Sequence, residues 1–577
     1  MSSKLLFNRA SLLALVLSLV VLAPFGVPTE PSAQAQRADR IDAEYTALIK
    51  QYLTDTRINT ELVDHLPASD KVPTPLKFLG RVTGQPGYLT YAREIHAYMK
   101  AIADAAPQRA RFWTIGQTEE GRDQIILAIG SEETIKNLDR YKADLVALTD
   151  PRRTTEAQAR QIISRAKPIY WLTSGVHSTE RGGPEMLTEL AYRLVVSESP
   201  FIQQIRNNVI TFITPVVEVD GRERIVDTAY FNAQRQAEGI NAPLGLPYWG
   251  KYVAHDNNRD GMGQFLAMTK NVMKIANEWK PTILHDLHEQ ASLLYASTGT
   301  GPYNEQLDPI TIGEWWMFAQ NDVMEKTKPG VPGVWTYGFY DGWTPNYMFY
   351  AVHTHNATGR FYEVGSYSTN NQIVPRTPAA AAAPSAPAGR GAGANVAGGQ
   401  AGRGAAPGAG RGGGRGNSRE WFRPNPDPGD VNWGPRAHVN MSQSAVLFAL
   451  SFTGKDKERW LENYWIKNRN AVNRGINGPV HGWVIPADQH SKANAAEAVA
   501  GLQAQGVEIH RASSMASLGG VTVKPGDWVI RGDQPYRTVV DMYFAVQDYS
   551  MANPSPYDDL GWTYPMMRNL VMTPITD

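Results

Sequence analysis

His177 and Glu180 are three residues apart, between a strand-like apolar run over 168–173 and a Pro-led helical pattern over 184–195. Further along the chain, a second strand-like run ends at His288. A catalytic zinc ion commonly takes three protein ligands, often two His and one Glu, and keeps one position for water. The sequence therefore predicts a hydrolytic zinc site with His177, Glu180 and His288 as ligands.

The His-x-x-Glu pair is a weak signal by itself, because a chain with 12 His contains about one such pair by chance. The alternative is an ordinary loop His beside a Glu that caps a helix or forms an ion pair. The third ligand is also open between His288 and His285, with His255 as a more distant candidate. Strand residues three apart face opposite ways, so only one of the first two can reach the metal. We favour His288, because it lies at the end of its strand.

The composition narrows the class of protein. A chain of 577 residues is too long for one ordinary core, so we expect two or more domains. Lys+Arg and Asp+Glu balance at 56 each, so the net charge argues for neither nucleic acid nor an anionic membrane surface as a partner, and we expect no nucleic-acid partner. The absence of Cys excludes disulfides, thiol nucleophiles and thiolate metal sites. Any metal must therefore be held by His and carboxylates.

The N-terminus has the pattern of a signal peptide over residues 1–35. Lys4 and Arg9 precede an apolar run over 12–23, and Ala33-Gln-Ala35 offers a small-residue cleavage site. The apolar run is short for a transmembrane span, although an uncleaved anchor is the alternative. We expect an exported protein, secreted or periplasmic, with no stable membrane insertion after cleavage.

The remaining chain divides into segments of different texture. Residues 36–110 predict helices and irregular stretches, including a helix over 90–105. From 111 to 475 strands alternate with helices, which indicates a largely parallel sheet covered on both faces. We expect strands over 111–115, 123–129, 168–173, 208–217 and 281–287, and helices over 184–195 and 264–279. Such sheets carry their sites at the carboxyl ends of strands, where His177, Asp220, His288 and Glu363 could converge.

Two further segments follow. Residues 375–418 are rich in Ala, Pro, Gly and Arg and predict a disordered insert within the domain over 111–475. Residues 476–577 predict a small α/β unit with strands over 482–485 and 507–510 and helices over 495–505 and 538–549.

The ordered motifs resemble those of the zinc metallocarboxypeptidases, specifically bacterial secreted members with a C-terminal extension. The resemblance spans about residues 116–364. It is carried by Gly116-Gln-Thr-Glu-Glu-Gly-Arg122, His177-Ser-Thr-Glu180, Pro215-Val-Val-Glu-Val-Asp-Gly221, Asn257-Asn-Arg259, Asp286-Leu-His288 and Phe361-Tyr-Glu363. The chain departs from the family pattern at Glu218 and Val219, where the family has Asn-Pro. The resemblance implies a three-layer α/β/α fold around a mixed, mainly parallel sheet of eight strands. It also implies one zinc ion and release of a C-terminal residue from a peptide.

The resemblance also assigns roles to residues. Glu363 would be the general base, with a buried structural ion pair as its alternative role. Asn258 and Arg259 would bind the terminal carboxylate of the substrate, since the planar guanidinium fork matches a carboxylate. Tyr340 would cover that carboxylate or would only pack.

The oxyanion arginine and the specificity pocket are less well defined. Arg222, Arg224 and Arg235 compete for the oxyanion role in a predicted loop, and our choice is Arg235. Asp341-Gly-Trp343 would line the specificity pocket.

Residues 476–577 faintly resemble a class I glutamine amidotransferase-like domain, through Ile485-Pro-Ala-Asp488 and Gly506-Val-Glu-Ile-His510. Without Cys this unit cannot be an active amidotransferase, so a structural or substrate-positioning role is expected. For the whole chain we expect a secreted zinc metallocarboxypeptidase. The alternatives are a zinc amidase or deacylase on a non-peptide amide, and a metal-free binding protein of the same fold.

Overall fold

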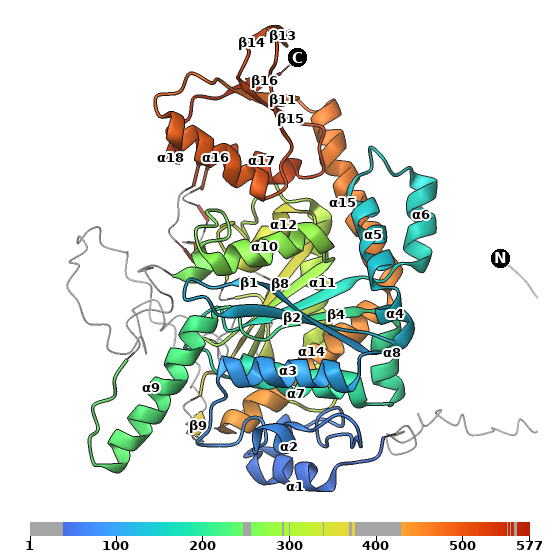
Figure 1. The fold of residues 1–577 in the computed structure, drawn as a ribbon, viewed down its shortest axis with the longest axis vertical. Helices are drawn as coiled ribbons and strands as arrows, with labels where there is room; N and C mark the ends of the chain where they lie inside the picture. Colours follow the sequence, from blue (N-terminus) through green and yellow to red (C-terminus); the bar gives the residue numbers. More distant parts are fainter. Residues whose placement is uncertain are drawn as a thin grey trace, which may run out of the picture. The chain divides into compact units, whose positions relative to one another are not determined.

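The centre of the structure is an eight-stranded sheet (Figure 1). The computed structural model describes residues 39–245, 256–290, 293–298, 301–338, 340–367, 372–374, 429–550, 552–553, 556–558 and 562–576. The strand order is β1-β2-β4-β3-β5-β8-β6-β7. The strands are β1 Ala110–Gln117, β2 Asp123–Ile129, β3 Ile169–Ser174, β4 Ile210–Thr214, β5 Ile283–His288, β6 Leu294–Ala296, β7 Val334–Trp335 and β8 Thr358–Val364.

The sheet is mixed, with a parallel centre. β4, β3, β5 and β8 are neighbours and run parallel, as do β6 and β7. The pairs β1–β2, β2–β4 and β6–β8 are antiparallel. The predicted mixed, mainly parallel eight-stranded sheet is therefore confirmed.

Helices cover both faces of the sheet because its strands are apolar on both sides. Along β2, Ile126 and Ala128 belong to one core cluster, whereas Ile125 and Leu127 belong to the other. This alternation follows from the two-residue period of a strand. The first face packs against α5 Leu138–Thr149, α6 Glu156–Arg165, α10 Ala267–Trp279 and α12 Met348–Thr354. The second packs against α3 Ala92–Ala105, α7 Gly182–Val196, α8 Pro200–Asn208, α11 Pro309–Thr327 and α14 Pro435–Lys455.

The segment after β4 is a helix and not the loop that was predicted. α9 spans Val219–Ala237, and its buried residues lie only between Val219 and Val226. The rest of the helix is exposed or only partly buried. A polar helix without a long apolar stripe gives little periodic signal in the sequence. The remaining short helices of the domain are α4 Glu132–Lys136 and η3 Asn257–Arg259, and the small β9–β10 pair joins Gln372–Val374 to Val431–Trp433.

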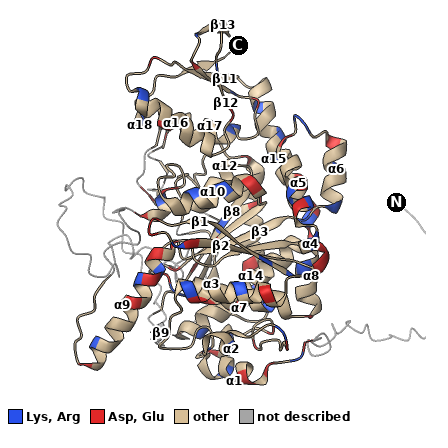
Figure 2. Cartoon of the chain, viewed as in Figure 1, with Lys and Arg blue, Asp and Glu red and all other residues tan. Residues whose placement is uncertain are grey.

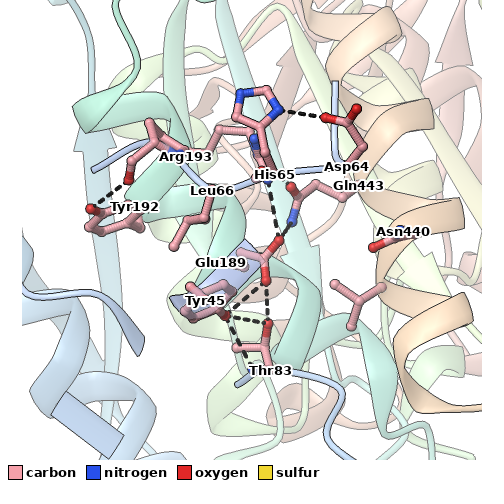
Figure 3. A network of polar contacts seen from close by, with 12 residues as sticks. Tyr45, Asp64, His65, Leu66, Thr83, Glu189, Tyr192, Arg193, Asn440 and Gln443 are labelled. Carbon is pink, nitrogen blue, oxygen red and sulfur yellow. Dashed lines mark hydrogen bonds and ion pairs between the residues drawn. The ribbon is translucent and has the colours of Figure 1, made fainter. Parts of the chain in front are cut away.

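The N-terminal segment packs onto α7 and α14 through a buried polar network (Figure 3). It contains α1 Ala43–Tyr52, η2 Thr56–Ile58 and α2 Pro75–Leu79. Glu189 of α7 accepts hydrogen bonds from the hydroxyls of Tyr45 (2.9 Å) and Thr83 (2.8 Å). It also forms an ion pair with Arg436 of α14, with 2.6 Å between Nη1 and Oε2. Both charged side chains are fully buried. Three distant segments are therefore joined at one carboxylate.

The C-terminal unit has its own four-stranded sheet in the order β12-β15-β11-β16, and every described pair in it is antiparallel. Its strands are β11 Gly482–Ile485, β12 Ile509–Arg511, β15 Trp528–Arg531 and β16 Thr573–Ile575, with a separate hairpin of β13 Ala516–Leu518 and β14 Val521–Val523. Its helices are α16 Lys492–Ala504, α17 Arg537–Phe544 and α18 Tyr564–Met567, and α15 Lys457–Asn477 precedes it. Trp483 and Ile485 join the core cluster of the first sheet face, so the unit packs directly on the larger domain.

Acidic and basic residues are interspersed along the described helices, for example on α9 (Figure 2). None of the helices in the described part of the chain has the length and apolarity needed to span a membrane. The predicted signal peptide over 1–35, the predicted insert over 375–418 and the candidate His255 lie outside the described residues.

Candidate metal centre

Three strand ends bring the predicted site together. The loop after β3 carries His177 and Glu180, and β5 ends at His288. In β8, Glu363 is the register partner of His288. Partners on neighbouring parallel strands point to the same face of a sheet, so these two side chains share one side.

The loop between β3 and α7 is a tight turn. Gly175 has a φ of +65°, a left-handed conformation that favours glycine. The N–H of Glu180 donates to the carbonyl of His177 at 3.0 Å. α7 then begins at Gly182, where an added Cβ would lie 2.2 Å from the His438 ring. The loop therefore directs both potential ligands toward one point.

His177, Glu180 and His288 form a cluster that could hold a metal ion. One ligand atom from each residue lies within 4.8 Å of the other two. The two Glu180 carboxylate oxygens bridge the rings, at 2.7 Å from Nδ1 of His177 and 2.9 Å from Nδ1 of His288. Both imidazoles thus turn the same nitrogen, Nδ1, toward the shared centre.

Two aspartates hold the outer nitrogens of these rings. Asp256 lies 2.9 Å from Nε2 of His177, and Asp286 lies 2.8 Å from Nε2 of His288. In metal-binding His residues, the ring nitrogen that does not bind the metal usually contacts an oxygen in this way. The contact fixes the tautomer and the orientation of the ring. No role was predicted for either aspartate from the sequence. The sequence offered one signal for each of them: Asp256 directly precedes Asn257-Asn-Arg259, and Asp286 lies two residues before His288.

His285 points to the other face of β5. Its Nδ1 lies 2.8 Å from the hydroxyl of Tyr170, and its ring packs edge-on against Tyr362 at 4.2 Å between centroids. Burial lowers its pKa well below the ordinary value, so it is neutral. The alternation of strand side chains thus places His288, and not His285, in the cluster.

Glu363 is buried beside the cluster. Its Oε2 has no hydrogen-bond partner among the described residues. Burial raises the pKa of Glu363 to about 8, the charge of His288 opposes this shift, and the charge of Glu180 adds to it. A bound cation would also oppose it and favour the carboxylate form.

Asn258 and Arg259 lie next to the cluster, but both are engaged within the chain. Nδ2 of Asn258 is 3.2 Å from Nε2 of His288, and its Oδ1 accepts the N–H of Met348 at 3.0 Å. Arg259 forms an ion pair with Asp558 of the C-terminal unit, with 2.5 Å between Nε and Oδ2. The predicted carboxylate receptor therefore holds a carboxylate of the protein itself.

The predicted oxyanion arginines lie on α9. Arg235 is in the last turn of α9, where its Nη2 donates to the carbonyl of Ala242 at 3.1 Å. This contact is with the segment after α9 and not with His177, Glu180 or His288. Arg222 is buried and pairs with Glu185 at 2.7 Å, and Arg224 pairs with Glu120. The location of Arg235 does not support the role predicted for it, and the other two have structural partners.

Asp220 and Tyr340 each contact residues outside the cluster of His177, Glu180 and His288. Asp220 accepts hydrogen bonds from Thr118 (2.8 Å) and Arg122 (2.7 Å), and so holds the turn after β1 instead of joining the cluster. Tyr340 is buried, and its ring packs edge-on against Phe361 with 5.0 Å between centroids. Tyr340 thus packs over the strand that carries Glu363.

The donor set fits zinc. Two imidazole nitrogens and one carboxylate within 4.8 Å of one another are a common ligand set of catalytic zinc. The second-nitrogen contacts to Asp256 and Asp286 complete the pattern expected around such ligands.

A comparison with known proteins found a family model and solved structures to which the chain is similar. The zinc carboxypeptidase family model (Peptidase_M14) matches residues 95–309. A metallo-carboxypeptidase from Burkholderia cenocepacia is 14% identical with a TM-score of 0.37, over 64% of this chain and 70% of that chain. A metallo-carboxypeptidase from Pseudomonas aeruginosa is 12% identical (TM-score 0.35, 64% and 70%). A carboxypeptidase A from Helicoverpa armigera is 18% identical (TM-score 0.32, 56% and 71%).

No curated protein matches the chain. The family match ends at residue 309, so it gives no support to the amidotransferase-like resemblance of the C-terminal unit. The chain therefore contains a segment that matches the zinc carboxypeptidases, and this segment holds all three candidate metal ligands.

Proposed function

We propose that the chain is an exported zinc-dependent peptidase of the carboxypeptidase type. His177, Glu180 and His288 would hold one zinc ion, and Glu363 would be the general base. The observation that carries this proposal is the convergence of the three ligands at the strand end where Glu363 is in register with His288. The predicted signal peptide over 1–35 supports export.

Zinc bound here would supply a Lewis acid that polarises a carbonyl and makes water more acidic. Glu363 would take the proton of the attacking water at its unpartnered Oε2 and pass it to the leaving amine. Burial excludes bulk water from this carboxylate and makes it a stronger base than an exposed Glu. Asp256 and Asp286 are positioning residues that hold the two rings.

The test is Glu363→Gln in the zinc-loaded protein. We expect about one zinc ion per chain in both wild type and variant, and a kcat/KM for peptide hydrolysis lower by about 10²–10⁴-fold in the variant. Glu462→Gln, an exposed substitution with the same change in charge, should behave like wild type. Absence of zinc from the wild type, or full activity of Glu363→Gln, would reject the proposal.

A second candidate function is hydrolysis of an amide that has no free carboxylate. The Arg259–Asp558 ion pair favours it, because Arg259 is the residue expected to receive a substrate carboxylate. Peptides with free and with amidated C-termini separate the two candidates. Preference for free C-termini supports the carboxypeptidase, and preference for amidated C-termini supports the second candidate.

A further inference from the structure

The C-terminal unit contributes Tyr557 and Asp558 to the surroundings of the metal centre. Asp558 contacts Arg259 through both carboxylate oxygens, with Nε to Oδ2 at 2.5 Å and Nη2 to Oδ1 at 3.2 Å. The hydroxyl of Tyr347 donates to Oδ2 of Asp558 at 2.5 Å, and Arg259 lies over the Tyr347 ring at 4.5 Å. Two contacts from one guanidinium to both oxygens of one carboxylate are the bidentate geometry in which arginine commonly binds carboxylates.

Tyr557, the residue before Asp558, holds this part of the C-terminal unit against the larger domain. Its N–H donates to Oδ2 of Asp341 at 2.5 Å, and its hydroxyl donates to Oε1 of Gln290 at 3.1 Å. Its ring packs against Tyr340 with 5.5 Å between centroids. Asp341, predicted to line the specificity pocket, therefore binds the backbone of the C-terminal unit.

Each nitrogen of the Arg259 guanidinium already has a partner within the chain. Its third nitrogen, Nη1, donates to the carbonyl of Asn258 at 3.1 Å and lies 3.4 Å from Oδ2 of Asp256. The Arg259 and Asp558 side chains are only 19% and 17% exposed. Arg259 thus already has two carboxylate neighbours, Asp256 and Asp558.

We infer that Asp558 is a specificity-determining residue that occupies the carboxylate-binding face of Arg259 and competes there with the C-terminal carboxylate of a substrate. The inference rests on the proposed hydrolytic function of the neighbouring metal centre. A substrate carboxylate must displace Asp558 before it can reach Arg259. A neutral C-terminal group leaves the ion pair intact.

The kinetic test compares two peptides that differ only in a free or an amidated C-terminus. In Asp558→Asn the ratio of kcat/KM for the free over the amidated peptide should rise by at least about 10-fold, because one charge-assisted competitor is removed. Asp548→Asn makes the same change in charge at an exposed position of the same unit and should leave the ratio unchanged. An unchanged ratio in zinc-loaded, folded Asp558→Asn would overturn the inference.

A binding test keeps the inference separate from the proposed function. Calorimetry with N-acetylphenylalanine and with its amide needs no hydrolysis. Asp558→Asn should bind the free acid at least about 10-fold more tightly than wild type does, and bind the amide equally. Adding Arg259→Lys should abolish this gain, since Lys lacks the fork. Equal binding of the acid by wild type and Asp558→Asn would refute the inference, whereas absence of any peptidase activity would refute only the proposed function.

Tyr347→Phe provides a second route if Asp558→Asn does not fold. It removes one donor to Asp558 and leaves both charges in place. The free-over-amidated ratio should then rise in the same direction by a smaller factor, and an unchanged ratio in this folded variant would count against the inference.

Discussion

The clearest test of the metal centre is the replacement of its outer aspartates. Asp256→Asn and Asp286→Asn keep the shape of each side chain and remove its charge. Each carboxylate holds Nε2 of one ring, at 2.9 Å for His177 and 2.8 Å for His288. Loss of such partners weakens metal binding by about 10–100-fold, or roughly 1.4–2.7 kcal/mol.

The structure also predicts which of the two substitutions weakens zinc binding more. The Asp256 side chain is 30% exposed and also forms an ion pair with Arg259. We therefore expect Asp256→Asn to lower the zinc affinity by about 10-fold. Asp286 is fully buried and also accepts a hydrogen bond from Thr173 at 2.8 Å, so we expect about 100-fold.

Competition with a chromophoric zinc chelator at fixed pH measures both dissociation constants. Asp139→Asn, at an exposed residue outside the centre, is the matched control and should bind zinc like wild type. Affinities unchanged for both variants would refute the metal centre as described. A larger loss in Asp256→Asn than in Asp286→Asn would refute the argument from burial.

Two further predictions concern stability. Glu189→Gln should lower the free energy of unfolding in urea by about 3–5 kcal/mol, because it leaves Arg436 buried without its countercharge; a loss below about 1 kcal/mol would contradict this. Burial lowers the pKa of His353 from 6.5 to about 3, so its contribution to stability is complete above pH 6.5 and is lost as the pH falls toward 3. In His353→Gln, the slope of unfolding free energy against pH near pH 5 should decrease by up to about 1.4 kcal/mol per pH unit, and an identical slope would exclude this role.

The strands of the central sheet could be predicted because their apolar runs are continuous. The run over 123–129 coincides with β2, and that over 168–173 differs from β3 by one residue at each end. The run over 208–217 was too long, since its first residue ends α8 and its last residues form the turn into α9. Local pattern thus identifies a buried strand but not where neighbouring elements end it.

The residues of the candidate site likewise divide into those that local pattern can predict and those that it cannot. His177, Glu180 and His288 follow from spacing and strand alternation, which are local properties. The contact of Asp558 with Arg259 joins residues 299 positions apart, and no spacing rule connects them. The oxyanion role predicted for Arg235 is subject to the same limit of local pattern, because the position of an arginine in a predicted loop depends on whether that loop is helical.

The ion pair between Glu189 and Arg436 also affects how the chain is made. The two residues are 247 positions apart. At about 5–20 residues per second, a ribosome takes roughly 12–50 s to add Arg436 after Glu189. During that time Glu189 has only Arg193 of the same helix as a countercharge, at 3.4 Å. The ion pair that joins α7 to α14 can therefore form only late in translation. For a chain with a predicted export signal, this delay prolongs the unfolded state in which a nascent protein can be handed to a translocation channel.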